Sequence, residues 1–355
     1  MSRSTVQPTA TGDGVGSAVS PDLDIPALPG SMAQDVSDAP PLLLHPLRFF
    51  EQAWLGRNAW WRYLLAAGLF MLLVVAVSIG LSALSVTVFS LINGLRSAEA
   101  AMNAFGRSGV LMFSLLMAAS ALGLPILFLV VRLIHRRSWR SLLIGPQGFD
   151  WSGFSHSLGL CLAIGCFIFF LEQTFWPGAA RLAFDADRFW PFLALAIVLV
   201  PLQTLAEEAI FRGYVLQGVA RATGVFAIRL VVPALLFAGL HFNNAAVVTG
   251  GIWGALEFVV VALYLTYLTL RGDGIEHAWG FHLGNNWLAF VLIRSTASDF
   301  NIPSLFVVDG VIDAWGLVYA AITCALHYGL LLRFSAQRLV RRTVAGGTIA
   351  EAARG

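Results

Sequence analysis

Long apolar runs are the feature of this sequence that most constrains its fold, and about eight of them can be traced. Roughly 20 consecutive apolar residues, wound into an α-helix, are needed to cross the hydrocarbon core of a bilayer. Inside lipid every backbone N–H and C=O must be paired within the chain, and helices meet this requirement. Only 12% of the residues are charged, whereas a soluble domain is nearer about 25%. We therefore expect an all-α polytopic membrane protein, with about eight transmembrane helices around a polar intramembrane cavity.

The expected spans are evenly distributed over the chain after its first sixty residues. Their approximate limits are 64–94, 109–134, 153–175, 189–219, 226–242, 246–270, 275–294 and 312–333. The fifth span is short and contains Pro233, which is compatible with a tilted or incomplete crossing. The spans show no obvious internal repeat, although transporters built from inverted halves often show one.

Four regions follow from the composition along the chain. Residues 1–44 are rich in Ser, Pro, Gly and Asp without an apolar period, and we expect a disordered tail there. Residues 45–63 mix tryptophans with arginines, which is typical of an interfacial segment. Residues 64–334 form the expected transmembrane domain, and residues 335–355 form a short cytoplasmic tail.

Arginines accumulate in alternate loops of the chain. They precede the first span and follow the second, fourth, sixth and eighth spans, while the other loops carry fewer arginines and more acids. Because cytoplasmic loops of membrane proteins are enriched in basic residues, both termini are expected to be cytoplasmic. The formal net charge of +2 is too small to suggest a nucleic-acid partner.

Two glutamates and an arginine stand inside the fourth expected span, in the stretch AEEAIFRGYVLQ at 206–217. A charged side chain at a bilayer centre costs roughly 2.5–3.5 kcal/mol on insertion scales. Glu208 and Arg212 are four residues apart, so they share a helix face in the favourable acid-first order. Glu207 is rotated away by about 100°. Glu207 must therefore bind a proton, a ligand, water or a residue on another helix, unless the two acids serve only to hold helices together.

Further polar residues follow in the later spans. The stretch FAGLHFNN places His241 at the end of the fifth span, and GFHLGNNW places His282 and Asn286 on one face of the seventh. A lone histidine in such a span is more often a hydrogen-bonded packing residue. Two histidines, an amide four residues on and an unpaired Glu207 favour a joint site.

These side chains are sufficient for hydrolysis by two routes. A carboxylate beside a histidine can orient and deprotonate water. A histidine and an asparagine on one face can donate hydrogen bonds to a developing oxyanion. Alternatively, Glu207, His241 and His282 supply a carboxylate and two imidazoles, which is a zinc ligand set with one position open for water. The chain lacks the HExxH signature, and spacing leaves both routes open.

Three motifs in order, EExxxR at 207–212, FxxxH at 237–241 and HxxxN at 282–286, carry a family resemblance. The chain resembles the CPBP family of CAAX proteases and bacteriocin-processing enzymes, also called the Abi family of intramembrane proteases. The segments FRG at 211–213 and RGDGI at 271–275 are also similar to that family. The likeness covers residues from about 190 to 295, the motif core of an expected transmembrane protease domain.

The resemblance implies an intramembrane endopeptidase with its site in a cytosol-facing cavity. Glu207 would activate water with His241, His282 and Asn286 would stabilise the oxyanion, and Glu208 and Arg212 would support the site. The prenyl-protein CAAX endopeptidase belongs to this family, and both a metal-independent glutamate mechanism and a divalent metal such as zinc stay open. The expected partners are a peptide or protein substrate, lipidated or membrane-associated, and membrane lipid, in the bacterial inner membrane.

Two other classes of function compete with the protease. One is a non-catalytic membrane scaffold or immunity-type protein on the same fold. The other is an ion- or proton-coupled transporter, which would explain isolated charges but neither the HxxxN step nor the EE-to-R spacing.

The span limits also place His241 and His282 at different depths. They can lie close together only if the fifth span is tilted, is broken near Pro233 or begins deeper in the membrane than the limits 226–242 imply.

Overall fold

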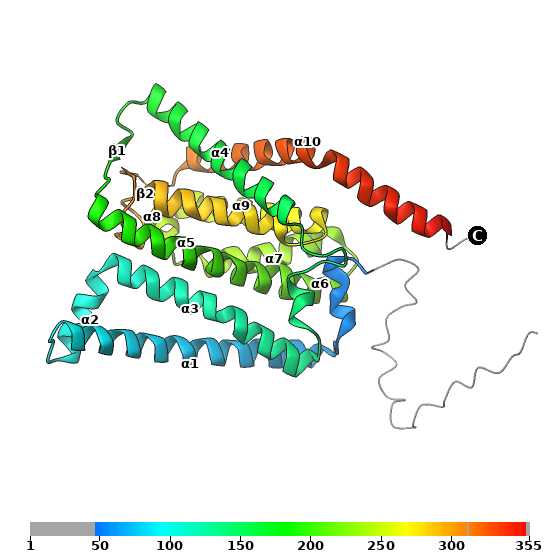
Figure 1. Ribbon diagram of the computed structural model, residues 1–355, viewed down its shortest axis with the longest axis horizontal. Coiled ribbons are helices and arrows are strands. Elements are labelled where there is room, and N and C mark those ends of the chain that lie inside the picture. Colours follow the sequence, from blue (N-terminus) through cyan, green and yellow to red (C-terminus); the bar gives the residue numbers. More distant parts are fainter. Residues whose placement is uncertain (1–46, 311, 353–355) are drawn as a thin grey trace, which may run out of the picture. The chain divides into compact units, whose positions relative to one another are not determined.

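The structure is a computed structural model that describes residues 47–310 and 312–352, with side chains up to Phe334. The tail expected at 1–44 lies outside the described residues. The described part is dominated by helices, with a small sheet at one end (Figure 1). The elements in chain order are η2 (Phe49–Leu55), α1 (Trp60–Ile92), α2 (Ala98–Arg107), α3 (Gly109–Val130), η3 (Val131–His135), η4 (Trp139–Leu142), α4 (Trp151–Phe175), β1 (Ala180–Leu182), α5 (Ala186–Glu208), η5 (Ala209–Val215), α6 (Leu216–Ala222), α7 (Phe226–Leu240), α8 (Ala245–Gly272), α9 (Glu276–Trp287), η6 (Leu288–Leu292), β2 (Ile293–Ser295), β3 (Phe306–Val308) and α10 (Ala314–Ala352).

Helices occupy all eight expected span positions, which confirms the all-α polytopic architecture. Among the described residues, six helices are long and apolar enough to cross a membrane. The other two, α7 and α9, have 15 and 12 residues. At 1.5 Å per residue, α7 extends about 22 Å, which is shorter than a hydrocarbon core of about 30 Å. Helix α10 continues through the expected cytoplasmic tail to Ala352.

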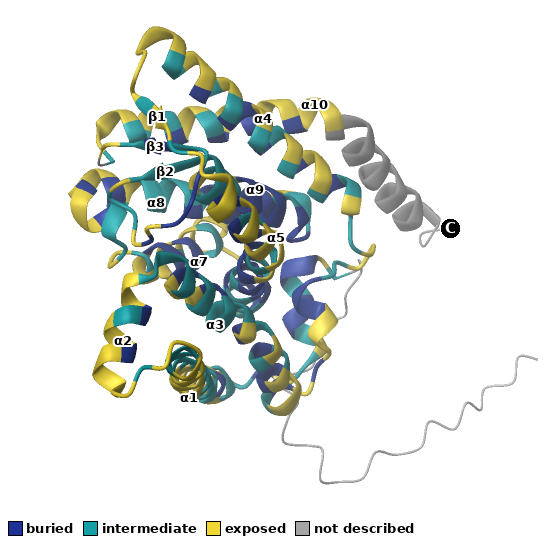
Figure 2. Ribbon diagram, turned by 60° about the vertical axis from the view of Figure 1, so that its left-hand side comes forward, coloured by how far each residue is buried: buried dark blue, intermediate teal, exposed yellow. Residues whose placement is uncertain are grey.

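The short helix α9 lies at the centre of the bundle. It packs against α4, α5 and α8, and Figure 1 shows it between α4 and α10 on one side and α5 and α7 on the other. Leu283 joins an apolar cluster with side chains of α3 and α5, and Phe281 joins a second cluster with side chains of α4, α8 and α10. Because helices surround it, α9 is buried in protein over most of its length (Figure 2).

Helix α1 has the opposite environment. Ala66 is its one buried residue, although its 33 residues include the most hydrophobic window of the six candidate spans. Large apolar side chains such as Leu91 are exposed, and Figure 2 shows this helix at the edge of the bundle. An apolar surface of this size on a helix of spanning length is suited to contact with lipid.

The segment before α1 is packed against the protein in its first part and exposed in its second part. Phe49 and Phe50 in η2 are buried. The Phe49 amide donates to Asp273 Oδ1 at 2.9 Å, and Gln217 Nε2 donates to the Phe49 carbonyl at 3.1 Å. Trp60 is 75% exposed. The expected interfacial segment therefore consists of a docked first half and an exposed aromatic second half.

A three-stranded sheet in the order β1-β3-β2 closes one end of the bundle. Strand β1 pairs antiparallel with β3, and β2 pairs parallel with β3. Each strand has three residues, and the Ala180↔Val308 pair joins segments far apart in the sequence. The sheet ties the loop after α4 to the segment between η6 and α10.

Gly280 allows α9 to approach α4 closely, and a side chain there should be destabilising. A Cβ at this position would lie 2.5 Å from the Phe154 carbonyl oxygen and 3.0 Å from the Leu158 amide nitrogen. We expect Gly280→Ala to lower the free energy of unfolding by about 1–3 kcal/mol, because backbone must move. Helix unfolding followed by circular dichroism in detergent measures this effect. Gly159→Ala on α4, where a Cβ meets nothing within 4 Å, is the matched control; equal stability of the two variants would contradict the prediction.

Candidate active site

The first motif lies where the helix changes its hydrogen-bond pattern. Helices α5 and α6 are joined through η5, a π-helical segment over Ala209–Val215, into one helix from Ala186 to Ala222. The Leu216 amide donates to the Phe211 carbonyl, five residues back. Such π segments within α-helices are frequent at functional sites, because they re-aim the side chains around them.

Glu208 and Arg212 form the buried ion pair that their spacing predicts. Arg212 Nη1 donates to Glu208 Oε1 at 2.9 Å, and neither side chain is exposed. Arg212 Nη2 also donates to the Ala262 carbonyl of α8 at 3.2 Å, and its guanidinium lies 4.5 Å from the centre of the Phe237 ring. The pair therefore fixes α5 and η5 against α7 and α8.

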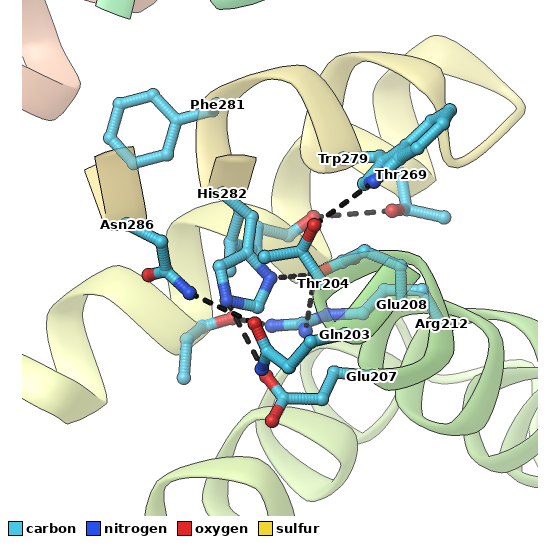
Figure 3. Close-up of polar contacts among 12 residues, drawn as sticks. Gln203, Thr204, Glu207, Glu208, Arg212, Thr269, Trp279, Phe281, His282 and Asn286 are labelled. Atoms are coloured by element: carbon cyan, nitrogen blue, oxygen red, sulfur yellow. Dashed lines mark hydrogen bonds and ion pairs between the residues drawn. The ribbon is translucent and has the colours of Figure 1, made fainter. Parts of the chain in front are cut away.

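His282 of α9 reaches both glutamates, one with each ring nitrogen (Figure 3). Its Nδ1 lies 2.8 Å from Glu208 Oε1, and its Nε2 lies 3.4 Å from Glu207 Oε2. Glu208 Oε1 accepts from Arg212 as a carboxylate oxygen, so the hydrogen of the shorter contact must belong to His282 Nδ1. Glu208 thus orients the imidazole and turns Nε2 toward Glu207.

Glu207 has no hydrogen-bond partner for one of its buried oxygens. Its side chain is 16% exposed, and Oε2 forms no hydrogen bond with the described residues. The 3.4 Å approach to His282 Nε2 is an ion-pair distance when the imidazole is protonated. A buried carboxylate oxygen without a donor needs water, a proton or a ligand. This is the environment that the sequence predicts for Glu207.

Asn286 lies one turn after His282 on α9, and its side chain is directed toward α5 (Figure 3). Its Nδ2 donates to Gln203 Oε1 at 3.2 Å. Gln203 precedes Glu207 by four residues and is buried. The amide pair therefore lies on the same helix faces as Glu207 and His282, and it extends the polar site along the contact of α5 with α9.

His241 lies apart from the two glutamates. It follows α7 directly, and its Nδ1 lies 2.8 Å from the Phe237 carbonyl, which can only accept, so Nδ1 carries the hydrogen. The remaining nitrogen, Nε2, is then an acceptor. Among the described residues His241 forms no hydrogen bond or ion pair with Glu207.

The Phe237 ring connects the two histidines. Its centre lies 4.5 Å from the His241 ring and 5.7 Å from the His282 ring, where the contact is edge-on. Helix α7 contains Pro233 but continues through it to Leu240, so it is not broken. Both histidines therefore have the Phe237 ring as a neighbour, and His241 immediately follows the last residue of α7.

Three further residues take part in this site: Gln203 and Trp279, which the sequence did not single out, and Phe237, which it singled out only as part of the FxxxH motif. Gln203 and Phe237 contact the predicted residues, as described above. Trp279 Nε1 donates to Thr204 Oγ1 at 3.1 Å and so ties α9 to α5 beside the glutamates. Gln203 could have been found, because it is a polar residue one turn before Glu207 on the same face of an apolar helix.

The proposed zinc ligands are not assembled in this arrangement. Among the described residues no group of three or more His, Cys, Asp or Glu side chains is placed to hold a metal ion. Glu207 and His282 lie together, whereas the His241 ring is held by the Phe237 carbonyl and stacks on Phe258. As placed here, the three side chains do not fit a common metal ion.

Comparison with known proteins identifies the family of this chain. Residues 187–288 match the family model described as "Type II CAAX prenyl endopeptidase Rce1-like". The chain is also 30% identical over 214 residues to the uncharacterized protein YyaK of Bacillus subtilis, an alignment that covers 58% of this chain and 72% of the relative. The chain belongs to the CPBP family of CAAX-type intramembrane proteases. No solved structure matches it.

The CPBP match places the site in context. The matched segment runs from the start of α5 to the end of α9, so it contains all three motifs and the helices that carry them. Membership of this family, together with the six candidate spans, makes the chain an integral membrane protein with a peptide or protein substrate. Helices α1, α3 and α4 lie outside the match; α3 packs against α5, α4 packs against α9, and α1 packs against α3.

Proposed function

We propose that this chain is an endopeptidase that hydrolyses a peptide bond near the membrane with water activated by Glu207. The observation that supports this most directly is the unpaired, buried Glu207 Oε2 beside His282 Nε2. A carboxylate that accepts from no protein donor is available to accept a proton from water. Glu208 differs because its Oε1 accepts from both Arg212 and His282, although its Oε2 is also buried without a hydrogen-bond partner among the described residues.

In this mechanism His282 acts at Nε2. Its Nδ1 hydrogen is donated to Glu208, which fixes ring orientation in the way that a carboxylate orients a catalytic histidine. When the imidazole is protonated, Nε2 carries the second hydrogen and can donate it to the oxyanion that forms as water attacks the carbonyl. Asn286 Nδ2, now on Gln203, would turn to the same oxygen as a second donor.

His241 is proposed as the second acceptor around the attacking water. Its Nδ1 hydrogen is occupied by the Phe237 carbonyl, so the Nε2 lone pair is left for a water hydrogen. The proton that Glu207 removes from water is then available for the leaving amine, as peptide hydrolysis requires. A bound substrate would have to bring water within reach of both Glu207 and His241.

The substrate class follows from the membrane setting. A peptide segment must reach side chains on membrane helices, so a tail held at the membrane by a lipid group, or a membrane-associated protein, would be suited to this site. The donor set of Glu207, His241 and His282 for zinc remains a proposal of second rank, since the three side chains are not assembled for it here.

The function is tested by peptide cleavage in reconstituted vesicles, using matched peptides with and without a lipidated cysteine near the C-terminus. Loss of one oxyanion donor typically lowers turnover by about 10²–10³, so we expect a loss of this size in His282→Ala. His156→Ala, at an exposed position on α4, should cleave like the wild type. Wild-type turnover in His282→Ala protein would contradict the role assigned to this histidine.

A further inference from the structure

A cavity of about 400 Å³ lies at the opposite end of α8 and α9 from the small sheet, and none of the proposed active-site residues lines it. Its walls come from the start of η2 and the residue before it, the first turns of α7, the last turns of α8, His277 in the first turn of α9, and the end of the apolar part of α10. Part of this wall is apolar, with Phe226, Leu268 and Leu332. The cavity thus lies where several helices end together.

Three arginines supply the charge of this cavity. Arg48, Arg229 and Arg271 line it, and none of the described residues that line it is a carboxylate. Asp273 offsets part of this charge, because its Oδ1 lies 3.4 Å from Arg48 Nε, yet two full positive charges are left over. An anion that enters would therefore meet a net positive field with low-dielectric walls on one side.

Two of the arginines are held in place by neutral groups. Arg229 donates to the carbonyls of Thr223 at 2.7 Å and Ala220 at 3.2 Å. The Phe50 ring lies between two guanidinium groups, 4.6 Å from that of Arg48 and 5.2 Å from that of Arg229. The carbonyls and the aromatic ring orient Arg229 without cancelling its charge, whereas Arg48 also has Asp273 as a partner.

The cavity lies at the ends of apolar helices, where lipid headgroups are expected. Phe226 begins α7, Arg271 is in the last turn of α8, and Leu332 is near the end of the apolar span Ala314–Phe334 of α10. The ends of three apolar helices mark the boundary between the hydrocarbon core and water. An occupant there would have its charged part among the arginines and its apolar part along the helix walls.

We propose that this cavity binds an anionic phospholipid, whose phosphate contacts Arg271 and Arg229 while an acyl chain lies against Phe226, Leu268 and Leu332. Basic pockets between membrane helices are suited to anionic headgroups. Inorganic phosphate shares the anion chemistry but would leave the apolar wall uncovered. The site would make the protein sensitive to the charge of its lipids, independently of any peptidase activity.

Native mass spectrometry of the purified full chain tests this site. Phosphatidylglycerol and phosphatidylcholine with the same acyl chains are titrated separately. We expect tighter binding of phosphatidylglycerol, and an affinity loss of about fivefold in Arg271→Gln, since one arginine near anionic lipid contributes about that factor. Leu332→Glu, which places a carboxylate on the exposed apolar wall, should weaken the same lipid without disturbing the core. Arg132→Gln, exposed at the end of the α3 span but outside the cavity, should bind like the wild type.

Three results would overturn the proposal. The first is equal affinity of the wild type for the two lipids. The second is an equal loss in Arg271→Gln and Arg132→Gln, which would indicate a general surface attraction. The third is displacement of the lipid by inorganic phosphate at similar concentration, which would assign the cavity to a free anion. Because binding is read directly, the test stands whether or not the chain cleaves peptides.

Discussion

Replacing Glu207 with glutamine is expected to lower peptide cleavage by about 10³-fold while the protein still inserts and folds. Glutamine keeps the size and position of the side chain but cannot accept a proton from water, and general-base catalysis typically contributes about 10²–10⁴-fold. Since Glu207 Oε2 has no protein hydrogen bond to lose, the substitution should leave the helix contacts intact. Initial rates in reconstituted vesicles, normalised to inserted protein, measure the effect.

Glu257→Gln is the matched control for this experiment. Glu257 is another glutamate on a membrane helix, half-buried on α8 and outside the site, so its substitution should leave cleavage unchanged. The same preparations decide between the two hydrolytic routes. Cleavage that persists after chelator treatment, in protein shown by elemental analysis to be metal-free, supports Glu207 acting without metal. Activity that is lost and then restored by zinc would refute that route.

Replacing Arg212 with methionine is expected to reduce the free energy of unfolding by about 3–5 kcal/mol, the largest stability effect in the site. Removing one partner of a buried ion pair leaves the other as an uncompensated charge. Glu208 would keep the His282 contact but lose Arg212, and the contacts of the guanidinium with the Ala262 carbonyl and Phe237 would disappear too. Unfolding in mixed micelles by SDS titration, followed by circular dichroism, measures the change.

Two companion variants isolate the charge effect. Arg181→Met removes the arginine of an exposed ion pair, in which Arg181 Nη2 lies 3.4 Å from Asp309 Oδ1. This substitution should change the free energy of unfolding by less than about 1 kcal/mol. The double variant Glu208→Gln/Arg212→Met removes both charges and should regain part of the lost stability. If the double variant loses as much free energy of unfolding as the two single variants together, the uncompensated charge of Glu208 is not the cause of the loss in Arg212→Met.

Helical periodicity was sufficient to predict how the first motif divides. Glu208 and Arg212 are neighbours because they are four residues apart, and this relation survives the π-helical η5 that begins between them. Periodicity could not predict that His282 contacts both glutamates. An imidazole has nitrogens on two sides of its ring, and whether it lies between adjacent side chains depends on how deeply α9 packs against α5, which no local pattern records.

Two other features could not be predicted from the sequence: the depth of residues in the membrane and the pairing of distant segments. A uniform span length placed His241 and His282 at different levels, whereas α7 has 15 residues and ends beside the site. The strands β1, β2 and β3 are too short for alternation of apolar and polar residues to be visible, and their pairing joins distant segments. Gln203 is different, since its position one turn before Glu207 was available from the sequence alone.

The enclosed position of α9 has a consequence for how the protein enters its membrane. Its sequence, EHAWGFHLGNNW, carries histidines, asparagines and a glutamate, and such residues oppose transfer of an isolated helix into lipid. Helices α8 and α10, which precede and follow it, are long and apolar. Insertion of α9 must therefore be driven by its neighbours, and its polar side chains become shielded from lipid only after the surrounding helices have assembled. The polar centre of the protein is thus a product of late assembly, because His282 and Asn286 gain their partners only when α9 packs against α5.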